Sequence, residues 1–242
     1  MRQHLSACVF ALSFVLGVSS NGLSQTANFT TIDFPGASVN SAQGINPRGD
    51  IVGQYVDPKT GQSFLHHGYL LSAGSFTSFD FPGARETFGF GINPGGDIVG
   101  LYTVGSVAHG FLLSRGTFTS IDFPGASRTV AFGINPEADV VGEYTSAGVT
   151  HGFLLRWGSF TTIDFPGAIL SSPRAINPRG DIVGNYNNSA SVGHGFLLSG
   201  GRFSTIDFPG ASLTAALGIN PPGDIVGAYV KAGVVHGFLT SR

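Results

Sequence analysis

From residue 28 onward, short apolar runs alternate with clusters of Gly, Pro and Ser. Runs such as DIVGLY and HGFLL are rich in β-branched and aromatic residues, and turn-forming residues bound them on both sides. No stretch shows the 3.6-residue period of an amphipathic helix. The pattern therefore predicts an all-β chain.

These runs belong to an internal repeat. Between successive copies of IDFPGA or FDFPGA come an INP segment, a DIVG-like segment and an HGFLL or HGYLL segment. Each unit thus offers four strands in about 42 residues, which is the size of a β-propeller blade. The Asp residues of the five copies, spaced 47, 42, 42 and 43 residues apart, are Asp33, Asp80, Asp122, Asp164 and Asp207.

A two-residue turn of the form X-Gly follows each HGFLL segment except the last, and it sets the register of the next strand. With Arg115-Gly116 as the turn, Leu113 faces Phe118, and His109 faces Asp122 thirteen residues later. Cross-strand partners lie within hydrogen-bonding reach. The sequence therefore predicts structural His–Asp pairs: His67 with Asp80, His109 with Asp122, His151 with Asp164, and His194 with Asp207.

The two ends of the repeat complement each other. His236 has no downstream Asp, and Asp33 has no upstream HG segment. We therefore expect His236 to pair with Asp33, so that the N-terminal strand FTTIDF completes the last blade. Ring closure also removes exposed sheet edges. The prediction is a five-bladed β-propeller closed by its N-terminal strand, and an open β-solenoid is the alternative.

These motifs resemble a known family. The segment HGFLLSRGTFTSIDFPGA, followed by GINP and DVVG, is similar to the HAF-type extracellular repeat family, over about residues 28–242. This chain has Gly where the family's triplet has Ala, at positions 68, 110, 152, 195 and 237. The resemblance implies export and repetition, and it implies no catalytic residues.

Residues 1–27 have the pattern of a signal peptide. Arg2 precedes an apolar run from Ala7 to Val18, which is too short to span a bilayer. We therefore expect an exported protein without stable membrane insertion, whose single propeller domain covers residues 28–242. Cys8, the only cysteine, precedes the apolar run instead of following it, so it is poorly placed for a lipoprotein box.

Charge and motifs narrow the classes of partner. The net charge is −2 and no Lys or Arg cluster occurs, so we expect no nucleic-acid partner. The NPRGD segments at 46–50 and 177–181 contain Arg-Gly-Asp, but their equivalents are NPGGD, NPEAD and NPPGD. The changing third position indicates a turn in which Arg48 and Arg179 occupy the freest place. An adhesion motif is therefore not favoured, and we expect neither a cofactor nor a metal.

Specificity in a repeat protein should lie where the repeats differ. The first unit has an insertion that contributes Asp57, Lys59, Gln62 and His66, and the residues after VG include Gln54, Glu143 and Asn185; these seven are the predicted ligand-binding residues. Phe90 and Phe132 are predicted to pack between blades. They belong to another variable set, the residues that precede GIN or AIN: Gln43, Phe90, Phe132, Arg174 and Leu217.

The sequence therefore favours an exported, non-catalytic binding or surface-interaction module, with a glycan or a protein as ligand. A lectin-like glycan binder would gather exposed aromatic residues beside Asn or Asp. A glycoside-active enzyme would need two non-repeated carboxylates about 5–9.5 Å apart. The non-repeated candidates are Asp57, Glu86, Glu137 and Glu143. A purely structural repeat is the remaining alternative.

Overall fold

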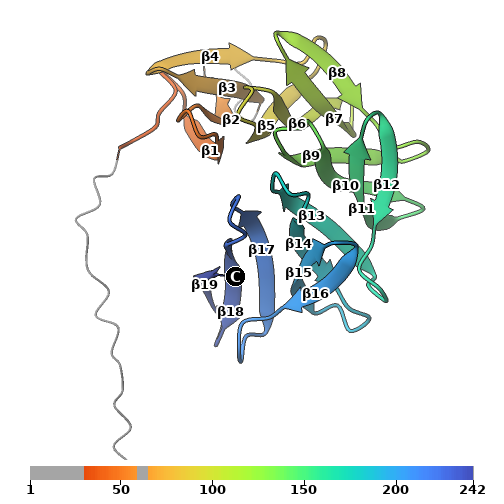
Figure 1. Ribbon diagram of the computed structural model, residues 1–242. Coiled ribbons are helices and arrows are strands. Elements are labelled where there is room, and N and C mark those ends of the chain that lie inside the picture. The colour runs from red at the N-terminus through yellow and green to blue at the C-terminus, as the bar shows by residue number, and fades with distance from the viewer. Residues whose placement is uncertain (1–29, 59–64, 242) are drawn as a thin grey trace, which may run out of the picture. The chain divides into compact units, whose positions relative to one another are not determined.

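The computed structural model describes residues 30–58 and 65–241, and residues 32–242 form one compact unit. Within this unit, five antiparallel sheets follow one another around a common centre (Figure 1). The predicted five-bladed β-propeller is confirmed.

Each blade is a meander whose first strand is the innermost. Blade one contains β1 (Val39–Ile45), β2 (Ile51–Val56), β3 (His66–Ser72) and β4 (Ser75–Phe79). Blade two contains β5 (Glu86–Ile92), β6 (Ile98–Val104), β7 (Val107–Ser114) and β8 (Thr117–Ile121). Blade three contains β9 (Arg128–Ile134), β10 (Val140–Ser146), β11 (Val149–Arg156) and β12 (Ser159–Ile163). Blade four contains β13 (Leu170–Ile176), β14 (Ile182–Asn187), β15 (Gly193–Ser199) and β16 (Arg202–Ile206). Blade five contains β17 (Leu213–Ile219), β18 (Ile225–Lys231) and β19 (Val234–Thr240).

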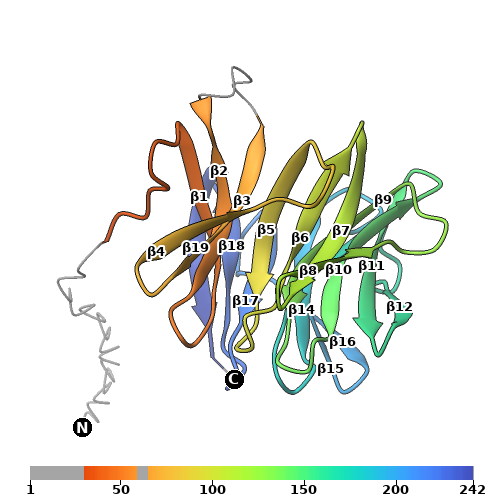
Figure 2. The same cartoon turned by 90° about the horizontal axis from the view of Figure 1, so that it is seen from above.

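The connections lie at two opposite ends of the unit, as Figure 2 shows. We call one end the crossover end, because it carries the DFPGA segments that lead to the next blade. The other is the turn end, which carries the NPxG turns and the X-Gly hairpins. At the hairpin of blade two, Ser114 faces Thr117 and Leu113 faces Phe118, which is the predicted register. Arg115 and Gly116 both have positive φ, 50° and 78°, as a type I′ turn requires.

The blades pack through the Val of each IVG or VVG segment. In blades one to four this Val is completely buried against the following blade; the four residues are Val52, Val99, Val141 and Val183. The neighbouring Gly is needed because its own sheet is crowded there. A Cβ on Gly100 would lie 1.8 Å from the carbonyl oxygen of Phe88, a distance no real contact allows.

Blade five differs from the other four. It has three strands among the described residues, and Val226, the equivalent of the buried valines, is 50 % exposed. The predicted fourth strand is not seen: residues 28 and 29 lie outside the described residues, and residues 30–34 form no strand. Phe34 stacks on Tyr55 of blade one, with ring centroids 3.7 Å apart, as Phe81 stacks on Tyr102 of blade two. This stack holds the first DFPGA segment against the blade that follows it.

No helix in the described part of the chain is long and apolar enough to cross a membrane.

Candidate functional site

Every inner strand contains a β-bulge at the same place in the repeat. In blade one, for example, the pairing of β1 with β2 shifts between Ala42 and Gly44, which leaves Gln43 as the extra residue. A bulge interrupts the alternation of side chains and can direct one of them away from the sheet's two faces. The five bulge residues are Gln43, Phe90, Phe132, Arg174 and Leu217.

These five residues line one cavity of about 260 Å³, together with the Gly or Ala and the Ile that follow each of them. All five inner strands contribute to it, so the cavity is the central channel of the ring. The bulge residues are the variable set that precedes GIN or AIN in the sequence. Phe90 and Phe132, predicted to pack between blades, are half-buried and contact each other across the channel wall, with centroids 5.5 Å apart.

The Gly after the bulge allows the inner strands to approach closely. A Cβ on Gly44 would lie 2.7 Å from the carbonyl oxygen of Phe90, and one on Gly91 would lie 2.7 Å from that of Phe132. The repeat therefore fixes the backbone around the channel and leaves the bulge side chain variable.

One side of the channel wall is an arc of aromatic residues that ends on an arginine. Phe88 packs against Phe90 with ring centroids 6.2 Å apart. The guanidinium carbon of Arg174 lies 4.1 Å from the ring centroid of Phe132, which is cation–π geometry. The arc thus joins an apolar surface to a positive charge.

Two guanidinium groups share one carboxylate behind this arc. Arg128 donates to Glu143 at 2.6 Å, and an Nη atom of Arg174 lies 4.0 Å from the other Glu143 oxygen. Ser172 donates to Glu143 at 2.5 Å, and Arg174 Nε donates to Asn185 at 3.3 Å. Burial is the main cause that lowers the pKa of Arg174. The cluster keeps one surplus positive charge beside the channel.

The seven predicted ligand-binding residues do not form a single site. Glu143 is only 9 % exposed and, with Asn185, lies behind Arg174. His66 bonds to Glu86 at 3.1 Å and stacks on Phe88, so it belongs to the interface of blades one and two. Gln54 lies within β2 opposite Ser41 and Gly68, and Asp57 directly follows this strand; neither is among the residues that line the channel. Lys59 and Gln62 lie outside the described residues.

Four of the predicted His–Asp pairs are present at the crossover end. In each pair His Nδ1 lies between 2.7 and 3.0 Å from the nearest Asp oxygen: His67–Asp80, His109–Asp122, His151–Asp164 and His194–Asp207. Each imidazole also packs on a Tyr that stacks on the Phe of DFPGA; Tyr102, for example, lies 5.1 Å from His109 and 3.6 Å from Phe81. These stacks connect one blade to the next.

The fifth predicted pair, His236 with Asp33, is not formed between the described residues. Asp33 accepts a hydrogen bond from Asn40 at 3.4 Å, and His236 stacks on Tyr229. The pair needs Asp33 to extend a strand beside β19, and residues 30–34 form no strand. The stack of Phe34 on Tyr55 does not exclude the pair, because Phe81 stacks on Tyr102 in the same way while Asp80 bonds to His67.

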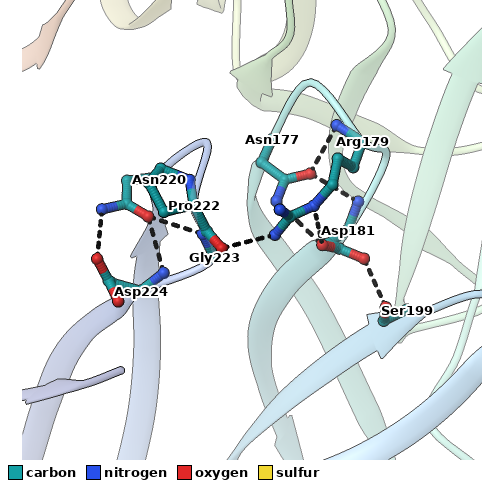
Figure 3. A network of polar contacts seen from close by, with 8 residues as sticks. All are labelled: Asn177, Arg179, Asp181, Ser199, Asn220, Pro222, Gly223 and Asp224. Carbon is teal, nitrogen blue, oxygen red and sulfur yellow. Dashed lines mark hydrogen bonds and ion pairs between the residues drawn. The ribbon is translucent and has the colours of Figure 1, made fainter. Parts of the chain in front are cut away.

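The Arg-Gly-Asp segments are parts of rigid turns. Arg179 bonds to Asp181 within its own turn at 3.3 Å and donates to the carbonyl oxygen of Pro222 in the next blade at 2.9 Å (Figure 3). Asp181 is 6 % exposed and accepts from Ser199 and Asn177. The arginine position, predicted to be the freest in the turn, is therefore used for a contact between blades.

Across the described residues, no group of three or more His, Cys, Asp and Glu side chains is placed to hold a metal ion.

No protein-family model and no curated protein matches the sequence. Solved structures match its fold. TolB from Acinetobacter baumannii superposes on 84 % of this chain with a TM-score of 0.63 and 15 % identity, and this chain spans 52 % of the TolB chain, about half its length. A streptogramin B lyase matches 84 % of this chain and 69 % of its own, with a TM-score of 0.50 and 16 % identity. At such identities the likeness concerns the fold alone.

Proposed function

We propose that this protein is an exported, non-catalytic binding module whose ligand enters the central channel. The observation that carries the proposal is that all five bulges fall on a position at which the repeats differ. A repeat that served only as a scaffold would have no reason to direct five side chains of four kinds at one cavity.

The lining of the channel supports a small ligand with two parts. Phe90, Phe132 and Leu217 offer apolar surface, which suits a flat or aliphatic body. Arg174, whose cluster carries the surplus positive charge, and Gln43 offer hydrogen bonds to acceptor groups. An apolar pocket with few convergent polar groups is the usual form of a small-molecule site.

The same lining argues for binding over catalysis. Its side chains come from Gln, Phe, Arg, Ile, Leu and Ala, none of which is a nucleophile or a general acid or base at neutral pH. Two of the four non-repeated carboxylates that a glycosidase could use have other partners: Glu86 bonds to His66, and Glu143 bonds to Arg128 and Ser172.

Export and membership of the HAF-type repeats are part of this proposal. Both rest on the sequence: the apolar segment at 7–18 after Arg2, and the HGF and DFPGA motifs. The residues that favour a lectin-like site lie away from the channel.

The channel is tested by a thermal-shift screen of small metabolites with residues 28–242. We expect at least one metabolite with an acidic group and an apolar body to raise the melting temperature. Arg174→Gln and Phe132→Leu should each weaken its affinity about tenfold or more, since a lost charged or aromatic contact in a pocket is worth roughly 1.4 kcal/mol or above.

The matched control is Arg202→Gln, which removes an exposed arginine from the outer strand of the same blade. It should leave the affinity unchanged. Equal affinity of all three variants, or a screen without any binder, would reject the channel as the ligand site.

A further inference from the structure

A second cavity lies on the side of the ring, between blades two and three. Its volume is about 540 Å³, within the range of roughly 300–1,000 Å³ that is usual for ligand sites. We call it the side groove. Leu112 and Ile121 of blade two and Leu155 and Phe160 of blade three form part of its apolar floor.

The turn-end rim of the side groove is built from departures from the repeat. Trp157 occupies a hairpin position that is Ala73, Arg115 or Gly200 in blades one, two and four. Glu137 occupies the position of Arg48, Gly95, Arg179 and Pro222. Ala138 has φ of 62° where the other four turns have Gly. Three unrelated departures therefore converge on one cavity.

A fourth departure from the repeat lies next to this rim and contacts two of its parts, the turn and the tryptophan. Where blades one, two and four have a Ser that donates to the turn Asp, blade three has Arg156. Arg156 donates to Asp139 through two nitrogens, at 2.9 and 2.7 Å, and its guanidinium carbon lies 5.9 Å from the Trp157 ring centroid. Arg156 thus takes over the role of the Ser and also contacts the Trp.

Trp157 is 91 % exposed although it is the only tryptophan in the chain. It borders the side groove and also a smaller cavity of about 210 Å³ that Arg179 and Gly180 of blade four help to line. Glu137 borders both cavities as well. An extended ligand could therefore pass over the indole and remain in contact with protein on both sides.

The polar groups of the groove are mainly acceptors. Glu137 is exposed at one end, and Asp122 lies at the other, where Ser120 and His109 bond to it. Carboxylates accept hydrogen bonds from hydroxyl groups and repel anions. A cation stacked on Trp157 would meet the positive charge of Arg156, which already lies near this ring. A neutral, hydroxyl-rich ligand with an apolar face is repelled neither by the carboxylates nor by Arg156.

We propose that the side groove binds a neutral carbohydrate chain. The C–H face of one sugar ring packs on the indole of Trp157, because the partly positive hydrogens face the negative face of the aromatic ring. Its hydroxyl groups donate to Glu137. The remaining rings continue toward Asp122 over the apolar floor. This site is independent of the central channel.

Because Trp157 is the only tryptophan, its fluorescence reports on this groove alone. The test titrates residues 28–242 with neutral oligosaccharides: cello-, xylo-, manno-, malto-, laminari- and chito-oligomers. At least one series should shift the emission to the blue and protect Trp157 from acrylamide quenching. Sulfated and uronic-acid oligosaccharides should bind at least tenfold more weakly.

Variants assign the signal to the groove. Glu137→Gln keeps the fluorescent reporter and should weaken binding at least fivefold. Trp157→Gly should abolish binding in calorimetry, and it should fold because Gly200 holds the same turn position with φ of 56°. Arg115→Gly, the same change in blade two, and Arg174→Gln, in the central channel, should leave binding unchanged.

Three results would overturn the proposal: no response of Trp157 to any oligosaccharide, undiminished binding by Trp157→Gly, or a response to tetralysine without a response to sugars. Failure of the central channel would instead appear with Arg174→Gln and small metabolites, so the two proposals fail separately.

Discussion

Tyr69 is a phenol at a position that the other four blades give to Phe111, Phe153, Phe196 and Phe238. It is completely buried, and no hydrogen-bond partner satisfies its hydroxyl among the described residues. Burial raises the pKa of Tyr69. Since a buried polar group without a partner costs about 1–3 kcal/mol, we expect Tyr69→Phe to raise the free energy of unfolding by about 1 kcal/mol in urea. A decrease would show that the hydroxyl has a partner in solution.

Ala138 gives the second prediction for a single residue. Its φ of 62° lies in the left-handed region, where a Cβ costs about 1–2 kcal/mol, and glycine holds this place in the other turns. Ala138→Gly relieves this strain but makes the unfolded chain more flexible. We expect a net gain of about 0.5–1 kcal/mol in the free energy of unfolding. Gly96→Ala, the reverse change in blade two, serves as the control and should destabilise.

Among the elements, the NPxG turns depend on a charged carboxylate. Asp50 accepts from Ser72 at 2.5 Å and from Asn46 at 2.9 Å, and these bonds, with a smaller effect of Arg48, lower its pKa below the ordinary value. The stabilisation is therefore present above about pH 4 and is lost as the pH falls through the lowered pKa. We expect Asp50→Asn to lower the melting temperature at pH 7 and to differ less from the native protein as the pH approaches 2. A difference that is constant with pH would contradict this.

The sequence predicts the elements that local signals define. The X-Gly hairpins fix the register of β7 and β8, and with it the His109–Asp122 pair, since turn type and strand pairing are set by adjacent residues. The bulges escaped prediction because an extra residue in a strand has no local signature of its own. The sequence shows that the five residues vary between the repeats, but their convergence on one channel depends on how the blades are arranged. The grouping of Glu137 with Trp157 depends on the same arrangement, because twenty residues separate them.

At the scale of the whole molecule, the first and last units of the repeat are not joined by the predicted His236–Asp33 pair. Asp33 bonds to Asn40, and His236 has no carboxylate partner among the described residues. A double-mutant cycle of Asp33→Asn with His236→Gln should therefore give a coupling energy near zero. The same cycle on Asp122 and His109 is the control, for which a partly exposed pair predicts roughly 0.2–1 kcal/mol. Equal couplings would show that the ring closes through the N-terminal strand, as the repeat predicts.

The bulges separate two tasks that usually compete within one strand. Strand pairing and blade packing depend on residues such as Val99 and Gly100, whereas Phe90 is excluded from the ladder by the register shift around it. A mutation of a bulge residue can thus alter what the channel accepts at little cost in stability. Natural selection, or a protein engineer, can change the five bulge residues one blade at a time. The residues that pair the strands and pack the blades stay the same.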